Sequence, residues 1–250
     1  MYKVGSYVTR NKYNNDIIFK IVEIKNNKAI LHGVDLRLYA DADINDLKLC
    51  TICKKKEEIN LNRQLDTNTY FYILGSILHI DSDEDYLKRC LKFYKKEKIK
   101  AYGYKYKENE YPMVIENLIK KHNPNIVVIT GHDAYYKKED SYKNSKYFIE
   151  SVLNIKKINS DIIIVAGACQ SNFEKLIISG SSFASSPNRI NIHALDPAII
   201  ASSIAKSEFD KTVNIKEIIS KTKCGIDGFG GIEIYGLMHK GLPRKDKNWI

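Results

Sequence analysis

Asn125-Ile-Val-Val-Ile-Thr-Gly-His-Asp133 and Asp161-Ile-Ile-Ile-Val-Ala-Gly-Ala-Cys-Gln-Ser171 are the two stretches that decide the fold of this chain. Each is a short β-branched run between polar residues, the pattern of a parallel strand that is covered on both faces. The first run ends at His132 and the second at Cys169. Because open α/β sheets hold their active sites at the carboxyl ends of parallel strands, we expect the imidazole and the thiol to meet at one sheet edge.

Strands and helices alternate around these two runs, from Tyr70 onward. Short apolar segments predict the strands, and apolar residues at helical spacing predict the helices between them. This alternation is typical of an α/β fold, a three-layer sandwich with a parallel sheet between helices. Further strands are predicted at 77–80, 99–106 and 182–184, and helices after 81–85, from 112 to about 121, around 148–155, at 172–178 and after 196–197.

The first 49 residues have a different pattern, which is rich in strands. Asn26-Asn27 predicts a tight turn between two of them. We expect residues 1–49 to form a separate small β-barrel of the SH3-like kind. Residues 50–69 are polar and are expected to link this barrel to an α/β domain over residues 70–250. The strand candidates in the barrel are 7–10, 17–25, 28–35 and 37–42.

The composition excludes several classes of protein. Of the 250 residues, 44% are hydrophobic and 17 are Tyr, which is typical of a globular protein and not of a disordered chain. No apolar run reaches the roughly 20 residues that span a bilayer, and the first ten residues lack the apolar segment of a secretory signal. We therefore expect a protein that works inside a cell, with no membrane partner.

The cysteines and acidic residues do not predict a metal or cofactor site. Five Cys without a framework spacing fit free thiols in a reducing compartment. Cys50 and Cys53 form a lone C-x-x-C pair, whereas a structural zinc site needs four ligands. The acidic run Asp81-Ser-Asp-Glu-Asp85 lacks the glycine of a calcium loop and is better explained as a helix cap.

The formal net charge of +10 attracts acidic partners, including nucleic acid. However, the lysines are scattered along predicted helices and loops, as expected for solvated faces. We therefore expect no dedicated nucleic-acid site.

His132 and Cys169 together have the chemistry of a nucleophile and its base. The 37 residues between them leave room for a loop, one helix and a return strand, so the two strands can be neighbours. A nearby imidazolium stabilises the thiolate, and the imidazole can later protonate a leaving amine. Gly131 and Gly167 leave space for a substrate backbone to approach, and the N–H of Cys169 is placed to bind an oxyanion.

An apolar block that ends in His, followed by one that ends in Ala-Cys, resembles the caspase-like cysteine peptidases. Ile-Thr-Gly-His132 and Val-Ala-Gly-Ala-Cys169 match that pattern in order and spacing. Those peptidases carry Gly directly after the His, where its N–H serves the oxyanion. Here Asp133 follows the His and Gly131 precedes it, so the pattern does not assign the second oxyanion donor, and Gly131, Asp133 and Gly167 are expected to line the site.

The chain as a whole is similar to the sporulation-specific peptidase YabG family. That resemblance implies a cysteine endopeptidase, without a cofactor, that is made during sporulation and processes spore coat or cortex-associated proteins. It also implies cleavage after basic residues, Arg above all, which needs a carboxylate in the specificity pocket; Asp196 and Asp227 are candidates by loop position. The matching segments are Leu78-His-Ile-Asp-Ser-Asp83, Val128-Ile-Thr-Gly-His-Asp-Ala134, Ala166-Gly-Ala-Cys-Gln-Ser171, Ser186-Pro-Asn-Arg-Ile-Asn-Ile-His-Ala-Leu-Asp-Pro197 and Gly228-Phe-Gly-Gly-Ile-Glu233.

Two alternatives stay open at this point. A glutamine amidotransferase-like amidohydrolase would pair Cys169 with His193 and Asp196, although its nucleophile turn lacks the second glycine. A non-enzymatic basic coat or nucleic-acid-binding protein would use the positive charge and the small barrel, and it would give Cys169 no special reactivity.

Overall fold

The computed structural model describes residues 2–50, 61 and 65–242. The chain divides into two compact units, Met1–Ile59 and Asn60–Ile250. Most of the predicted linker, residues 51–60 and 62–64, lies outside the described residues.

An antiparallel sheet of five strands, in the order β4-β3-β2-β1-β5, makes up the first unit. Asn26 and Asn27 have φ angles of 49° and 62°, the left-handed conformation that a two-residue hairpin turn requires. The four predicted strands are confirmed as β1 to β4, and β5 was not predicted. Closure into an SH3-like barrel stays a prediction. The elements are β1 (Tyr7–Arg10), β2 (Phe19–Lys25), β3 (Lys28–Gly33), β4 (Tyr39–Asp43) and β5 (Leu47–Leu49), with 3-10 turns η1 (Asn11–Tyr13) and η2 (Ile44–Asp46).

The small core of this unit comes from alternate positions of its strands. Val8, Phe19, Ile21 and Leu31 are fully buried in one hydrophobic cluster, because every second side chain of a strand points to the same face.

Six strands form the central sheet of the second unit, in the order β14-β13-β12-β9-β7-β8. Five of them are parallel, as predicted, and β14 runs antiparallel to β13 at one edge. The strands are β7 (Ile77–Asp81), β8 (Ala101–Lys105), β9 (Ile126–Thr130), β12 (Ile163–Ala166), β13 (Phe183–Ser185) and β14 (Phe229–Gly231).

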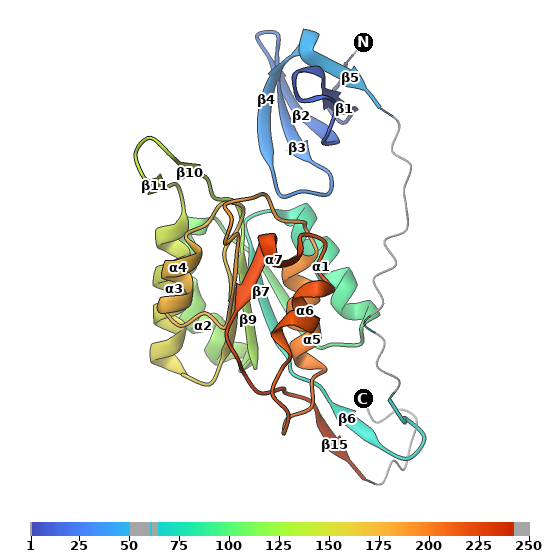
Figure 1. The fold of residues 1–250 in the computed structure, drawn as a ribbon, viewed down its shortest axis with the longest axis vertical. Helices are drawn as coiled ribbons and strands as arrows, with labels where there is room; N and C mark the ends of the chain where they lie inside the picture. The colour runs from blue at the N-terminus through green and yellow to red at the C-terminus, as the bar shows by residue number, and fades with distance from the viewer. Residues whose placement is uncertain (1, 51–60, 62–64, 243–250) are drawn as a thin grey trace. The chain divides into compact units, whose positions relative to one another are not determined.

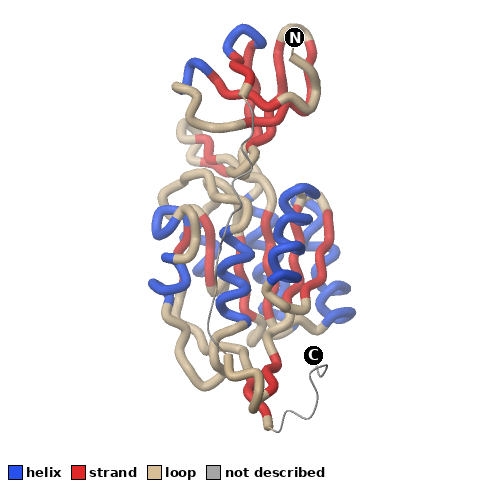
Figure 2. Tube along the Cα trace, turned by 90° about the vertical axis from the view of Figure 1, so that its right-hand side faces the viewer, coloured by secondary structure: helices blue, strands red, loops and turns tan. Residues whose placement is uncertain are grey.

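Helices cover both faces of this sheet (Figures 1 and 2). This cover explains why every residue of β9 and of β12 is buried. One face carries α2 (Tyr111–His122), α3 (Ser145–Ile158) and α4 (Phe173–Ile178), and the other carries α1 (Glu84–Lys96), α5 (Asp196–Ala205), α6 (Ile215–Ser220) and α7 (Gly225–Gly228).

The start of α1 shows how the sequence sets a helix boundary. The Asp83 side chain accepts hydrogen bonds from the backbone N–H groups of Asp85 and Tyr86, so Asp83 is the N-cap. This satisfies two of the free N–H groups of the first turn and places negative charge at the positive end of the helix. The capping role predicted for the acidic run is confirmed.

Several short elements have no clear sequence signal. β10 (Tyr135–Tyr136) and β11 (Ser141–Tyr142) form a hairpin after β9, β6 (Phe71–Ile73) pairs with β15 (His239–Gly241), and η3 (Glu108–Glu110) precedes α2. Two or three residues are too few for a periodic pattern, which is why these elements were missed.

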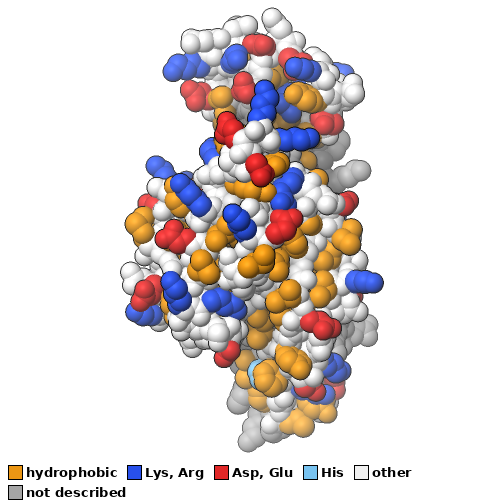
Figure 3. Space-filling model, turned by 60° about the vertical axis from the view of Figure 1, so that its left-hand side comes forward, with side chains coloured by type: hydrophobic (Ala, Val, Ile, Leu, Met, Phe, Trp, Pro, Cys, Tyr) orange, Lys and Arg blue, Asp and Glu red, His pale blue; other side chains and the backbone are white. Residues whose placement is uncertain are grey.

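The surface of the molecule has mixed character. In Figure 3, Lys and Arg side chains lie among acidic and apolar ones and do not gather into one stripe on that face. Among the described helices, none is long and apolar enough to cross a membrane.

Candidate functional site

The two strands singled out in the sequence are parallel neighbours. Ile129 of β9 lies opposite Ala166 of β12, and His132 and Cys169 each follow this pair by three residues. Both residues therefore leave the sheet at its carboxyl edge. β8 and β9 lie on opposite sides of β7, so the strand order reverses next to His132. This reversal is where open α/β sheets bind their ligands.

His132 and Cys169 also lie on the same face of the sheet. The His132 ring lies 6.1 Å, between centroids, from the ring of Tyr86 in α1. The sulfur of Cys169 accepts a hydrogen bond of 3.3 Å from the N–H of Ile192, just before α5. Because α1 and α5 contact each other and cover one face, the imidazole and the thiol share that face (Figure 1).

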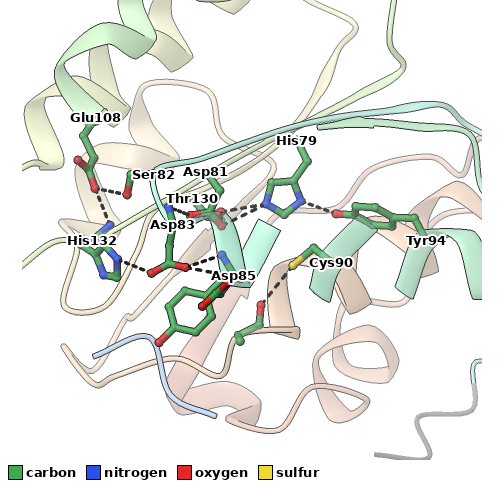
Figure 4. A network of polar contacts seen from close by, with 12 residues as sticks. His79, Asp81, Ser82, Asp83, Asp85, Cys90, Tyr94, Glu108, Thr130 and His132 are labelled. Carbon is green, nitrogen blue, oxygen red and sulfur yellow. Dashed lines mark hydrogen bonds and ion pairs between the residues drawn. The ribbon is translucent and has the colours of Figure 1, made fainter. Parts of the chain in front are cut away.

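A carboxylate from the neighbouring strand end faces the His132 ring. Asp83 Oδ2 lies 3.4 Å from His132 Nε2, while its Oδ1 is the helix cap (Figure 4). The Asp83 side chain is 6% exposed and that of His132 is 24% exposed, so the pair is shielded and the ring still reaches solvent. A carboxylate at Nε2 favours the tautomer with a proton on Nε2, which places the basic lone pair of the neutral ring on Nδ1.

The backbone of His132 is held on both sides. Its N–H donates to Glu108 Oε1 at 2.8 Å, and its carbonyl accepts from the side-chain amide of Asn144 at 2.7 Å. Glu108 Oε1 also accepts from the Ser82 hydroxyl (Figure 4). A Cβ on Gly131 would lie 2.8 Å from both Glu108 Oε1 and Ser82 Oγ. The space beside this glycine is therefore occupied by the protein's own side chains.

Asp133 joins the loops that follow β9 and β12. Its carboxylate accepts from the Ser145 hydroxyl at 2.5 Å, the Asn144 N–H at 2.7 Å, the Ala134 N–H at 2.9 Å and the Ser171 hydroxyl at 3.0 Å. Burial raises the pKa of Asp133 above its usual value, and these four hydrogen bonds oppose that rise. The geometry gives Asp133 a positioning role between the two loops.

The Cys169 loop is fixed by short contacts. Cys169 is 3% exposed, and the Ala168 N–H donates to the Ser171 hydroxyl, which in turn donates to Asp133. Gly167 has a φ of +107°, and a Cβ there would lie 2.4 Å from a serine oxygen of β13. The glycine is needed for this backbone conformation and for close packing of the chain.

Non-glycine residues with positive φ gather in the loops around Cys169. Gln170, Ser186 and Arg189 have φ angles of 57°, 63° and 54°. The Gln170 N–H donates to Ser186 Oγ and to the Ile190 carbonyl, which connects the two loops. Such backbone strain is retained where the surroundings fix it, and it clusters at functional sites.

A second thiol, Cys224, lies near Cys169 in the fold. Burial, with the nearby Asp196 carboxylate, raises the pKa of the Cys224 thiol to about 12, so this thiol stays neutral. Cys224 is the N-cap residue of α7, and its sulfur accepts from the His193 N–H at 3.2 Å. Cys224 is thus a packed thiol and a poor nucleophile.

The other predicted site residues are used by the fold in different ways. Asp196 is fully buried and accepts from the N–H groups of Lys223 and Cys224 at 2.7 and 3.0 Å. His193 Nδ1 accepts from the Leu195 N–H at 3.2 Å, which uses the nitrogen that a base would need. Asp227 is exposed and accepts from the Asn188 side-chain amide at 2.6 Å.

Sequence reasoning missed Asp83 and Glu108 as parts of this site. Asp83 carried a capping signal that explained it fully, and Glu108 lies in an unpredicted 3-10 turn. Among the described residues, no three His, Cys, Asp or Glu side chains are grouped so that they could hold a metal ion.

The chain is similar to known proteins over nearly its whole length. The family profile described as YabG peptidase U57 matches residues 3–63 and 51–243. The sporulation-specific protease YabG of Bacillus subtilis (strain 168) is 38% identical over 286 aligned positions, which cover 98% of this chain and 99% of that protein.

A solved structure also matches part of the chain, a putative cystathionine beta-lyase of Listeria monocytogenes involved in aluminum resistance. The match has 15% identity and a TM-score of 0.31, and it covers 44% of this chain and 30% of that one. We draw no conclusion about fold or function from it.

Proposed function

Because the chain belongs to the YabG peptidase U57 family, we propose that it is a cysteine endopeptidase in which Cys169 is the nucleophile and His132 the general base and acid. The observation that carries this proposal is the placement of both side chains at one sheet edge and on one face, with His132 next to the reversal of strand order. The Asp83 carboxylate beside the His132 ring supports it, since an oriented imidazole is what such a pair needs.

Each step of the proposed reaction uses a group that lies in this region. His132 takes the thiol proton of Cys169, and Asp83 stabilises the resulting imidazolium. The Ile192 N–H, which donates to the sulfur, stabilises the thiolate. The thiolate attacks the peptide carbonyl, and the N–H of Cys169 contributes to binding of the oxyanion.

The intermediate then divides into two products. The proton on His132 passes to the nitrogen of the scissile bond, the C–N bond breaks, and the amine leaves behind a thioester on Cys169. Water, deprotonated by His132, hydrolyses the thioester and releases the acid and the free thiol. Gly131, Asp133 and Gly167 serve this chemistry by fixing the two loops.

We further propose that the substrates are spore coat or cortex-associated proteins, cleaved after Arg inside the sporulating cell. Asp227 is the better candidate for the specificity carboxylate, since it is exposed and Asn188 is its hydrogen-bond donor. Asp196 is the weaker candidate, because its oxygens are buried against backbone N–H groups. An exposed carboxylate can bind a guanidinium bidentately.

The finer assignments of fold belong to the same proposal. We propose that residues 70–250 form a caspase-like domain and residues 1–49 an SH3-like barrel, joined by the linker 50–69. The five parallel strands between helix layers, and the antiparallel meander that precedes them, support these assignments.

The test combines thiol labelling with substitution. Iodoacetamide at neutral pH should modify Cys169 faster than Cys224, whose thiol pKa is raised to about 12. Cys169→Ala should remove peptide cleavage while the melting temperature stays close to that of the wild type. The matched control is Cys224→Ala, which removes a neighbouring thiol of raised pKa and should leave most activity. Retained cleavage in Cys169→Ala would refute the proposal.

Two histidine variants separate this proposal from the amidohydrolase alternative. His132→Ala should lose about as much activity as Cys169→Ala, since residues that act as a unit are not additive. His193→Ala should keep most activity. The opposite ranking of the two histidine variants would favour a catalytic pair of Cys169 with His193. A Cys169 thiol that iodoacetamide does not modify, in a protein that cleaves no peptide, would favour a binding protein.

A further inference from the structure

A network of buried, hydrogen-bonded side chains lies at the ends of β7 and β9, next to the proposed catalytic histidine. His79, fully buried in β7, lies with Nδ1 2.8 Å from the Tyr94 hydroxyl and with Nε2 2.9 Å from Thr130 Oγ1. The Thr130 hydroxyl donates to Asp81 Oδ2 at 2.8 Å. Asp81 is also fully buried, and its Oδ1 accepts from the Asp83 N–H at 3.0 Å (Figure 4).

The carboxylate at one end sets the direction of every hydrogen bond in this network. The Thr130 hydroxyl has one proton and donates it to Asp81 Oδ2, so Thr130 must itself accept from Nε2–H of His79. The other ring nitrogen of His79 then accepts from the hydroxyl of Tyr94. A chain of bonds that all point one way is cooperative and fixes its members in one arrangement.

This network ends at the two residues that face each other in the site. Asp81 and Thr130 are opposite one another in the β7–β9 ladder, and Asp83 and His132 each follow by two residues. One Asp81 oxygen accepts a hydrogen bond from the backbone N–H of Asp83, and the other accepts from the hydroxyl of Thr130, the last residue of β9 before the His132 loop. The distance between the Asp83 carboxylate and the His132 ring therefore depends on Asp81 and Thr130.

We propose that Asp81 and Thr130 are positioning residues for the Asp83–His132 pair, and this proposal rests on the peptidase function proposed above. They touch no substrate. They act by clamping the ends of β7 and β9 so that the carboxylate stays beside the imidazole. Tyr94 and His79 complete the clamp from α1 and β7. The effect is on the chemical step and not on substrate binding.

The test removes the hydroxyl of Thr130 and follows kcat and KM of the full chain on an Arg-containing fluorogenic peptide. We expect Thr130→Val to lower kcat about 10-fold with little change in KM, because an interaction used in the chemical step is lost. Thr130→Ser, which keeps the hydroxyl, should stay within about 3-fold of the wild type. Titration with an irreversible thiol inhibitor normalises each rate to the active molecules.

A double-mutant cycle separates positioning from general stability. If Thr130 acts through Asp83, then Thr130→Val in the Asp83→Asn background should cost less than about 2-fold. A residue that only stabilises the fold would cost the same factor in both backgrounds, and that result would overturn the proposal. Activity in Cys169→Ala would instead overturn the peptidase proposal, so the two failures differ.

The chain offers a matched control for the far end of the network. Tyr94→Phe and Tyr104→Phe each remove a hydroxyl that contacts a histidine, His79 at 2.8 Å and His122 at 2.6 Å. The second pair lies on the edge strand β8 and on α2, which covers the opposite face of the sheet from α1 and its Tyr94 (Figure 1). We expect a loss of kcat of at least about 3-fold in Tyr94→Phe alone. If Thr130→Val does not fold, the comparison of Tyr94→Phe with Tyr104→Phe tests the proposal instead. Equal kcat values in these two variants would overturn it.

Discussion

Replacement of Asp83 by Asn tests the electrostatic core of the proposed site. The change removes the charge beside His132 and keeps a side-chain oxygen that can cap α1, since Asn and Asp are about equally good caps. We therefore expect a large effect on the reaction and a small one on stability.

The magnitude follows from the distance of 3.4 Å between Asp83 Oδ2 and His132 Nε2. Coulomb's law gives about 1 kcal/mol for unit charges at this distance with the dielectric constant of water, and about 5 kcal/mol at an effective value of ~20. Because the carboxylate is 6% exposed and the imidazole 24% exposed, the true value lies between these limits. The rate of the step that forms the imidazolium should thus fall between about 10-fold and a few thousand-fold.

Two assays measure this effect. Peptide hydrolysis gives kcat, and the rate of Cys169 alkylation by iodoacetamide near neutral pH gives the thiolate population without any substrate. Both should fall in Asp83→Asn while the melting temperature changes by only a few degrees. A kcat within about 3-fold of the wild type, with alkylation unchanged, would refute the inference that Asp83 stabilises the imidazolium.

Three further predictions follow from other parts of the site. Gly167→Ala should destabilise the protein by about 2 kcal/mol or more in urea unfolding, because its φ is +107° and a Cβ would lie 2.4 Å from a serine oxygen. The control is Gly225→Ala, which should cost less stability because Gly225 has a φ of +54° and nothing lies within 4 Å of its Cβ position. Burial raises the pKa of Asp133 in the folded protein, so the wild type loses unfolding free energy as pH rises above about 4 and Asp133 ionises. Asp133→Asn cannot ionise, so its unfolding free energy should rise relative to that of the wild type over the same pH range. A difference between the two proteins that does not change with pH would contradict this. Asp227→Asn should lower kcat/KM for Arg substrates selectively, and an equal loss on neutral peptides in a cleavage library would exclude Asp227 as the specificity residue.

Much of the architecture is encoded in local sequence. The β-branched runs before His132 and Cys169 determined two buried parallel strands, because only a strand covered on both faces is apolar throughout. The acidic run before Glu84 determined where α1 begins, because its side chains satisfy N–H groups within the same turn. The pairing of His132 with Cys169 at one edge followed from the rule that a strand–helix–strand unit places its strands close together.

The partners of His132 were decided only by the tertiary structure. Asp83 is 49 residues away and Glu108 is 24 residues away in the sequence, and each reaches His132 because β7, β9 and η3 come together in space. In the sequence, Asp83 has a complete explanation as a helix cap, and one carboxylate oxygen does serve that purpose. The second oxygen faces His132 only because β7 and β9 pair side by side, and a local pattern holds no information about which distant strand will be the neighbour.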